Sequence, residues 1–140
     1  MQIIGFNFEK IEAERKKAPA GKIEINSNIN IRAISQEKIS MIKDEDVLKF
    51  AFDFSVTYKP DVADVKFNGY VLATVDKKET KDILKKWKTK KIPENLRIFL
   101  YNFILTKSNL KALQLEEELG LPTHVPLPRI QPQHDTSYTG

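Results

Sequence analysis

Cysteine is absent from the sequence. Disulfide bonds, cysteine nucleophiles and zinc sites built on thiolates are therefore excluded, and the composition fits a reducing compartment. Histidine is scarce as well, since His124 and His134 are the only two and both fall in a proline-rich region. A histidine-ligated metal site would need both residues together with carboxylates, so we expect neither a metal nor another cofactor.

Glycine-rich motifs and catalytic signatures are also missing. The five glycines nowhere form G-x-G-x-x-G or G-x-x-x-x-G-K-[ST], and neither HExxH nor GxSxG occurs. Paired carboxylates, such as Asp44 with Asp46, lie in surface-like runs, whereas general acid–base catalysis requires a pocket that shifts their pKa values. We therefore expect a protein that is not an enzyme.

Long apolar runs do not occur. No run of about 18 apolar residues could cross a bilayer, and residues 1–8 lack the basic and apolar regions of a signal peptide. We expect a cytoplasmic protein without membrane insertion. Of its 140 residues, 41% are hydrophobic and 30% charged, a mix typical of one folded domain. We place that domain at residues 1–132 and expect a disordered tail at 133–140.

Alternation of apolar and polar residues predicts four strands. It is clearest over residues 22–34, where four of the odd positions are isoleucine and three of the even ones asparagine. Residues 47–58 and 65–75 alternate likewise, and the proline-containing turn between them predicts an antiparallel hairpin. The pair Asn68-Gly69 continues the alternation, so we expect a kink or bulge there. Residues 3–11 predict the remaining strand.

The period changes to that of helices after Asp76. Residues 76–79 resemble a capping box and are followed by a short amphipathic pattern. Pro93 suits the first turn of a second helix, in which eight of the ten residues 96–105 are apolar. One sheet can cover only one side of such a helix, so its other side is a candidate subunit interface.

The second helix has two candidate end points. Ser108 and Asn109 could interrupt it, whereas the leucines that follow continue the pattern to Gly120, a suitable C-terminal stop. Four prolines within residues 122–132 then predict an extended strap.

The net charge of +4 is concentrated in residues 76–91, with eight lysines against three acids. Five of these lysines could contact phosphates: Lys85, Lys86, Lys88, Lys90 and Lys91. The alternative is that these lysines form a solvated helix face. The spacing of Trp87 with Ile83 and Leu84 favours this alternative, because it directs the indole toward the core and leaves the lysines on the outside.

The aromatic stripe of residues 50–58 also has two interpretations. It is either core or a binding surface, and core is favoured.

Three stretches are similar to the SecB export-chaperone family, particularly its divergent SecB-like members. Residues 6–15 resemble the opening strand of that family, and residues 47–58 with 65–75 resemble its central hairpin. Residues 93–101, continuing to residues 121–128, resemble its helix start and the strap after the helix. The resemblance implies an α+β fold in which a four-stranded antiparallel sheet packs on one long helix, with a short helix and a C-terminal proline-rich strap.

The resemblance also implies an ATP-independent holdase that binds unfolded or non-native polypeptides in hydrophobic grooves, and that forms a homo-oligomer, a dimer or a tetramer. The client-binding residues it suggests are Phe52, Phe54, Tyr58 and Tyr70, with Met41 and Ile42 in residues 36–46, which we expect to form a crossover loop. The interface residues it suggests are Ile98, Tyr101 and Leu105, on the helix face opposite Leu96, Phe99, Leu100 and Phe103.

This chain also departs from the SecB pattern. We expect no second C-terminal helix after the strap, and the sequence lacks the acidic balance associated with docking to the SecA motor and a basic tail, so a chaperone role carries over more safely than a SecA-linked one. A link to protein export stays open. Two alternatives also remain, a basic nucleic-acid-binding protein and a structural or assembly subunit.

Overall fold

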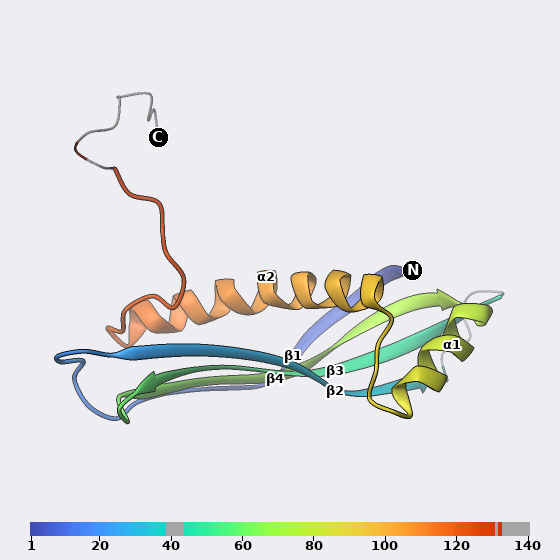
Figure 1. The fold of residues 1–140 in the computed structure, drawn as a ribbon, viewed down its shortest axis with the longest axis horizontal. Helices are drawn as coiled ribbons and strands as arrows, with labels where there is room; N and C mark the ends of the chain where they lie inside the picture. The colour runs from blue at the N-terminus through green and yellow to red at the C-terminus, as the bar shows by residue number, and fades with distance from the viewer. Residues whose placement is uncertain (39–43, 131, 133–140) are drawn as a thin grey trace.

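The computed structural model describes residues 1–38, 44–130 and 132 (Figure 1). Four long strands form one antiparallel sheet in the order β1-β4-β3-β2. The strands are β1 (Gln2–Arg15), β2 (Glu24–Glu37), β3 (Glu45–Lys59) and β4 (Ala63–Asp76), and the helices are α1 (Lys77–Trp87) and α2 (Glu94–Glu118). All four predicted strands and both predicted helices are present, and each strand is longer than its alternating pattern.

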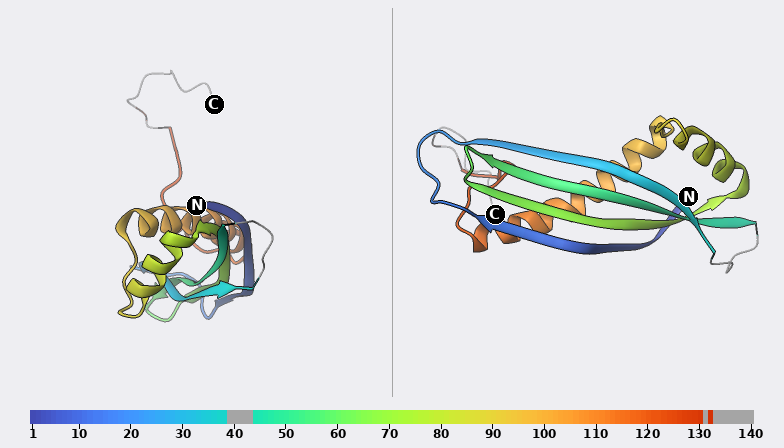
Figure 2. Two further views of the ribbon diagram at one scale, coloured as in Figure 1. Left: turned by 90° about the vertical axis from the view of Figure 1, so that its right-hand side faces the viewer. Right: turned by 90° about the horizontal axis from the view of Figure 1, so that it is seen from below.

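The molecule has two layers. Helix α2 runs along one face of the sheet, and α1 lies at one end of it (Figures 1 and 2). The even positions of β3 and the odd positions of β4 point toward α2 and form the core, which is why the two central strands are the most buried. The apolar sides of strands and helix are thus buried against each other.

Register shifts between paired strands adjust the strand pattern, and two of the three concern the predicted alternation. In β2 the pairing register shifts at Arg32, so Ile31 and Ile34 are both buried while Ala33 pairs with Ala51 on the other face. The predicted alternation over residues 22–34 therefore holds only as far as this bulge. Strand β4 continues through Gly69 as expected, but the bulge lies in β1 opposite it, between Phe8 and Lys10. A side chain at Gly69 would collide with the carbonyl oxygen of β1.

The turn between β3 and β4 confirms the predicted hairpin. The Lys59–Pro60 peptide bond is cis, Asp61 has a positive φ of 52°, and the amide of Val62 donates to the carbonyl of Tyr58 at 2.9 Å. The amine of Lys16, just after β1, reaches Asp61 at 2.9 Å and also contacts Asp64. The hydrogen bond to Asp61 is the main cause of the raised pKa of Lys16, and it lowers the pKa of Asp61.

The helix ends agree with the predictions, and of the two candidate end points of α2 the structure has the one at Gly120. The side chain of Asp76 accepts a hydrogen bond from the amide of Glu79 at 2.8 Å, which completes the N-cap of α1. Helix α2 continues through Ser108 and Asn109 because Ser108 lies on its buried face. That face repeats every four residues, at Leu100, Ile104, Ser108, Ala112 and Glu116. Gly120, with φ of 65°, follows the helix end.

The strap after α2 is packed only at its start. Leu121 is buried, and the hydroxyl of Tyr58 donates to the carbonyl of Pro122 at 2.6 Å. Farther along, Leu127 and Ile130 are exposed, and the segment leaves the body of the molecule (Figure 1). Neither helix of the described chain combines the length and the apolarity that crossing a bilayer requires.

Candidate functional site

Three of the residues expected to contact clients belong to the core. Phe52, Phe54 and Tyr58 point from β3 toward α2 and are at most 2% exposed. Phe52 stacks on Phe6 with ring centroids 5.4 Å apart, and Phe54 on Phe67 at 5.6 Å. In the folded chain the aromatic stripe of β3 is therefore core, which is the interpretation that the sequence favoured, and the contact of these residues with clients stays a prediction. The long helix and the edge strand β1 together cover it.

The other expected client residues are not on this face. Tyr70 lies on the opposite face of the sheet. There the amine of Lys49 is 4.4 Å from the centroid of the Tyr70 ring, and the side-chain amide of Asn7 donates to the Tyr70 hydroxyl at 3.2 Å. Met41 and Ile42 lie outside the described residues. The six predicted client residues are thus not brought together by the described part of the chain.

The predicted interface residues differ in exposure. Ile98 is 47% exposed, whereas Tyr101 and Leu105 are half-buried and pack against the core. Phe99, predicted to face the sheet, is instead 46% exposed, and Leu110 on the same helix is more exposed still. Helix α2 therefore does present apolar side chains away from the sheet.

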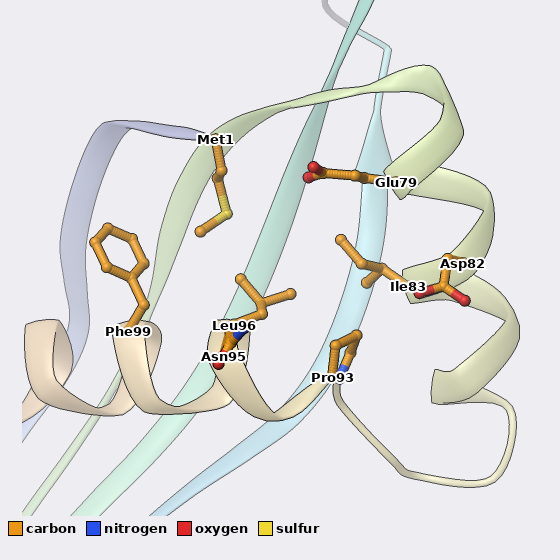
Figure 3. A pocket seen from close by; sticks show the side chains of 8 residues that line it. All are labelled: Met1, Glu79, Asp82, Ile83, Pro93, Asn95, Leu96 and Phe99. Carbon is orange, nitrogen blue, oxygen red and sulfur yellow. The ribbon is translucent and has the colours of Figure 1, made fainter.

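An apolar cleft opens where the start of α2 meets α1 and the beginning of β1. It measures about 360 Å³. Figure 3 shows Met1, Leu96 and Phe99 around the opening, with Glu79 and Asp82 of α1 at its rim. Outside the cleft, Ile4 and Ile11 of β1 are exposed as well, so β1 also presents apolar side chains to solvent.

A second hollow, which we call the basic cavity, lies between β2, the end of α1 and the first turns of α2. It measures about 620 Å³, within the range of ligand-binding pockets. Four cations line it: Arg32, Lys90, Lys91 and Arg97. Its apolar part is formed by Ile31, Trp87, Ile92 and Tyr101.

The basic cavity changes two interpretations of the sequence. Of the lysine cluster, only Lys90 and Lys91 line it, and of the two arginines Arg97 follows closely in α2 whereas Arg32 comes from β2, far away in the sequence. Trp87 is half-buried: it packs against the core, as its spacing indicates, yet also lines the cavity. The arginines were missed because their convergence depends on the Arg32 bulge and on the chain reversal before α2.

A buried polar cluster holds the start of the strap. Nδ1 of His124 is 2.7 Å from Oε2 of Glu116, and both side chains are at most 1% exposed. Oε1 of Glu116 accepts from the backbone amide of His124 at 3.1 Å, and Nε2 of His124 is 2.8 Å from Oδ1 of Asn109. Burial, followed by the charge of Glu116, raises the pKa of Tyr58. The cluster is closed to solvent, so its role is structural.

The buried pair could not be read from the alternation and helix patterns alone. Residue 116 continues the buried four-residue repeat, so a carboxylate there requires a buried partner. His124 was placed in a segment without periodicity, and nothing in the sequence pairs the two. Among the residues that the structure describes, no group of three or more acidic or histidine side chains could hold a metal ion.

Comparisons with known proteins support the fold. No protein-family model matches the sequence, and no curated protein matches it. A solved structure, that of a SecB-like chaperone from Mycobacterium tuberculosis in complex with a ChAD peptide from an antitoxin, superposes with a TM-score of 0.52. The match has 16% sequence identity and covers 93% of this chain and 90% of that one. The predicted α+β, SecB-like fold is therefore confirmed.

Proposed function

We propose that this protein is a non-enzymatic, chaperone-type protein of the cytoplasm that binds non-native polypeptides without ATP. The observation that supports this most is the SecB-like fold along nearly the whole chain, shared with a chaperone that was solved with a bound peptide. The proposal includes neither docking to a SecA-type motor nor a fixed role in export, because the chain lacks the charge pattern associated with that motor.

The apolar cleft and the basic cavity are the places where a client would bind. Both are open and lined by apolar groups, whereas the aromatic stripe of β3 is covered. Burial of one client side chain of the size of leucine or phenylalanine would contribute about 1.5–3 kcal/mol. Several such weak contacts give useful avidity, and because hydrophobic burial is non-directional, they tolerate many sequences.

Self-association through α2 forms the second part of the proposal. The predicted interface of Ile98, Tyr101 and Leu105 is retained with Ile98 as its exposed member. Tyr101 and Leu105 already contribute to the core, so a charge at either position would also destabilise the fold. A dimer or a tetramer would cover part of the apolar helix surface and bring several client sites together.

The test is light scattering of an unrelated, aggregating protein with and without this chain, at low and at high salt. Suppression of aggregation at both salt concentrations, near stoichiometric ratio, is the expected result, because burial of apolar surface depends little on ionic strength. Failure to suppress aggregation at any ratio would refute the chaperone-type role and leave the SecB likeness as one of fold only.

Nucleic-acid binding is the second candidate, favoured by the four cations of the basic cavity. Contacts with phosphates weaken steeply as salt rises. Retention of a labelled oligonucleotide that disappears at high salt, without suppression of aggregation, would support it. A dedicated assembly subunit would instead bind one protein stoichiometrically and ignore unrelated unfolded chains.

A further inference from the structure

The charge of the basic cavity is not neutralised from within. Among the residues that the structure describes, none of those lining it carries a carboxylate. Arg32 pairs with Asp53 through contacts of 3.4 Å, but Lys90, Lys91 and Arg97 form no ion pair within the described ranges 1–38, 44–130 and 132. A concave surface of one charge sign concentrates counter-ions, so this cavity is suited to an anionic ligand.

The aromatic rings of the cavity are already covered by the cations of the protein. The amine of Lys90 lies 4.6 Å from the ring centroid of Trp87, and the guanidinium of Arg97 lies 5.9 Å from that of Tyr101. Proteins that bind single-stranded nucleic acid offer ring faces on which bases stack. Here the cations occupy those positions, so base stacking would first have to displace them. This arrangement favours a carboxylate ligand over a nucleotide.

The backbone beside the cavity favours an extended polypeptide. Strand β2 is at the edge of the sheet and pairs only with β3 in the described chain, and its residues Asn30, Ile31 and Arg32 form one wall of the cavity. The unpaired edge of a strand can bind an extended peptide through main-chain hydrogen bonds, while neighbouring pockets accept alternate side chains. The bulge at Arg32 places a cation at this wall.

We propose that the basic cavity binds acidic segments of extended polypeptides, an inference that rests on the proposed function. Carboxylates of the segment pair with Lys90, Lys91 and Arg97, while an apolar side chain between them packs on the half-buried Ile92. The cavity therefore selects among non-native chains by charge, in addition to the sequence-tolerant burial of apolar groups.

The protein supplies its own probe, because Trp87 is its only tryptophan and lines the cavity. The ligand is a tryptophan-free, unstructured peptide of glutamate and serine with two central leucines, titrated at about physiological salt. Its counterpart with every glutamate replaced by glutamine is the ligand control, and oligothymidylate of equal length tests the nucleic-acid reading. We expect the acidic peptide to change the fluorescence of Trp87 and to bind about tenfold more tightly than either of the other two.

The variant Lys90→Gln/Lys91→Gln/Arg97→Gln removes three cations from the cavity. Its matched control is Lys77→Gln/Lys78→Gln/Lys81→Gln, which removes the same charge from exposed positions of α1 that do not line the cavity. We expect the first variant to bind the acidic peptide about tenfold more weakly and the control to stay within about twofold. Circular dichroism establishes that both are folded.

The outcomes separate this inference from the proposed function. Equal binding of the glutamate and glutamine peptides, or an equal loss in the control variant, would overturn the selection of acidic segments. Tighter binding of oligothymidylate would overturn the choice of a polypeptide. If aggregation is suppressed in either of these cases, the chaperone-type role stands and only the cavity assignment fails. If the protein neither suppresses aggregation nor binds any of the peptides, both the proposed function and the cavity assignment fail.

Discussion

Replacement of His124 by leucine tests the buried polar cluster most directly. The imidazole contacts the carboxylate of Glu116 at 2.7 Å and Asn109 at 2.8 Å, and both His124 and Glu116 are almost fully buried. Leucine preserves much of the volume but leaves the carboxylate without its partner. Breaking a buried pair from one side costs about 3–5 kcal/mol, mainly because the remaining charge stays out of water. We expect the free energy of unfolding to fall by that amount.

A second substitution separates charge from packing. Glu116→Gln retains an oxygen that can accept from the backbone amide of residue 124, as Oε1 of Glu116 does at 3.1 Å, but it removes the negative charge. In the His124→Leu background, this change should therefore stabilise the protein by about 2 kcal/mol, although it destabilises the wild type. Effects of Glu116→Gln on the free energy of unfolding that have opposite signs in the two backgrounds would show that the charge of Glu116 is tolerated only beside His124.

Urea denaturation followed by circular dichroism and by the fluorescence of Trp87 measures both variants. Equal slopes against urea would show that the change lies in stability and not in the compactness of either state. A loss in the free energy of unfolding below about 1 kcal/mol for His124→Leu would contradict the expected role of the pair. So would a double variant that is less stable than His124→Leu alone. Either result would mean that water or a rearranged strap solvates Glu116.

Three further predictions concern other parts of the molecule. Gly69→Ala should lower the free energy of unfolding by more than about 2 kcal/mol, because its methyl group would collide with the backbone of β1, and thermal denaturation measures the loss. Ile98→Asp should shift the mass measured by light scattering toward the monomer, whereas Gln114→Asp, a charge added at another exposed position of α2, should not; an unchanged mass for both would exclude Ile98 from the interface. The pKa of Asp61 is lowered in the folded state, so the stabilisation by its contact with Lys16 is present above the ordinary carboxyl pKa and is lost as the pH falls through the lowered value. A Lys16→Gln variant should accordingly approach the wild type in stability as denaturation is repeated from about pH 6 down to about pH 2.

Local signals predicted most of the fold. The alternation in β3 and β4 and the cap at Asp76 each depend on residues close together in the sequence, so each could be read directly. The bulges could not, because a register shift depends on how two strands twist against each other. The sequence left the continuity of α2 through Ser108 open for a related reason: a small polar residue is tolerated where the helix comes close to the sheet, which only the packing reveals.

The candidate sites were harder to predict than the fold, because they lie at the margins of the sheet. The aromatic stripe on β3 is a strong apolar signal in the sequence, and its side chains are buried in the core. The basic cavity, by contrast, combines single residues from β2, the end of α1 and the start of α2. No periodic pattern connects Arg32 with Arg97, so only the folded chain shows that they converge.

Because the core and the basic cavity use different residues, we expect Phe54 to contribute to stability but not to binding in the cavity. Its side chain is 2% exposed and stacks on Phe67, so Phe54→Ala should cost about 3–5 kcal/mol of stability. Where the variant remains folded, its affinity for the acidic peptide should equal that of the wild type, because Phe54 does not line the basic cavity. Chemical denaturation and titration of Trp87 fluorescence measure the two quantities on the same sample. A loss of affinity with little loss of stability would return Phe54 to the client surface, and would mean that α2 moves away from the sheet when a client binds.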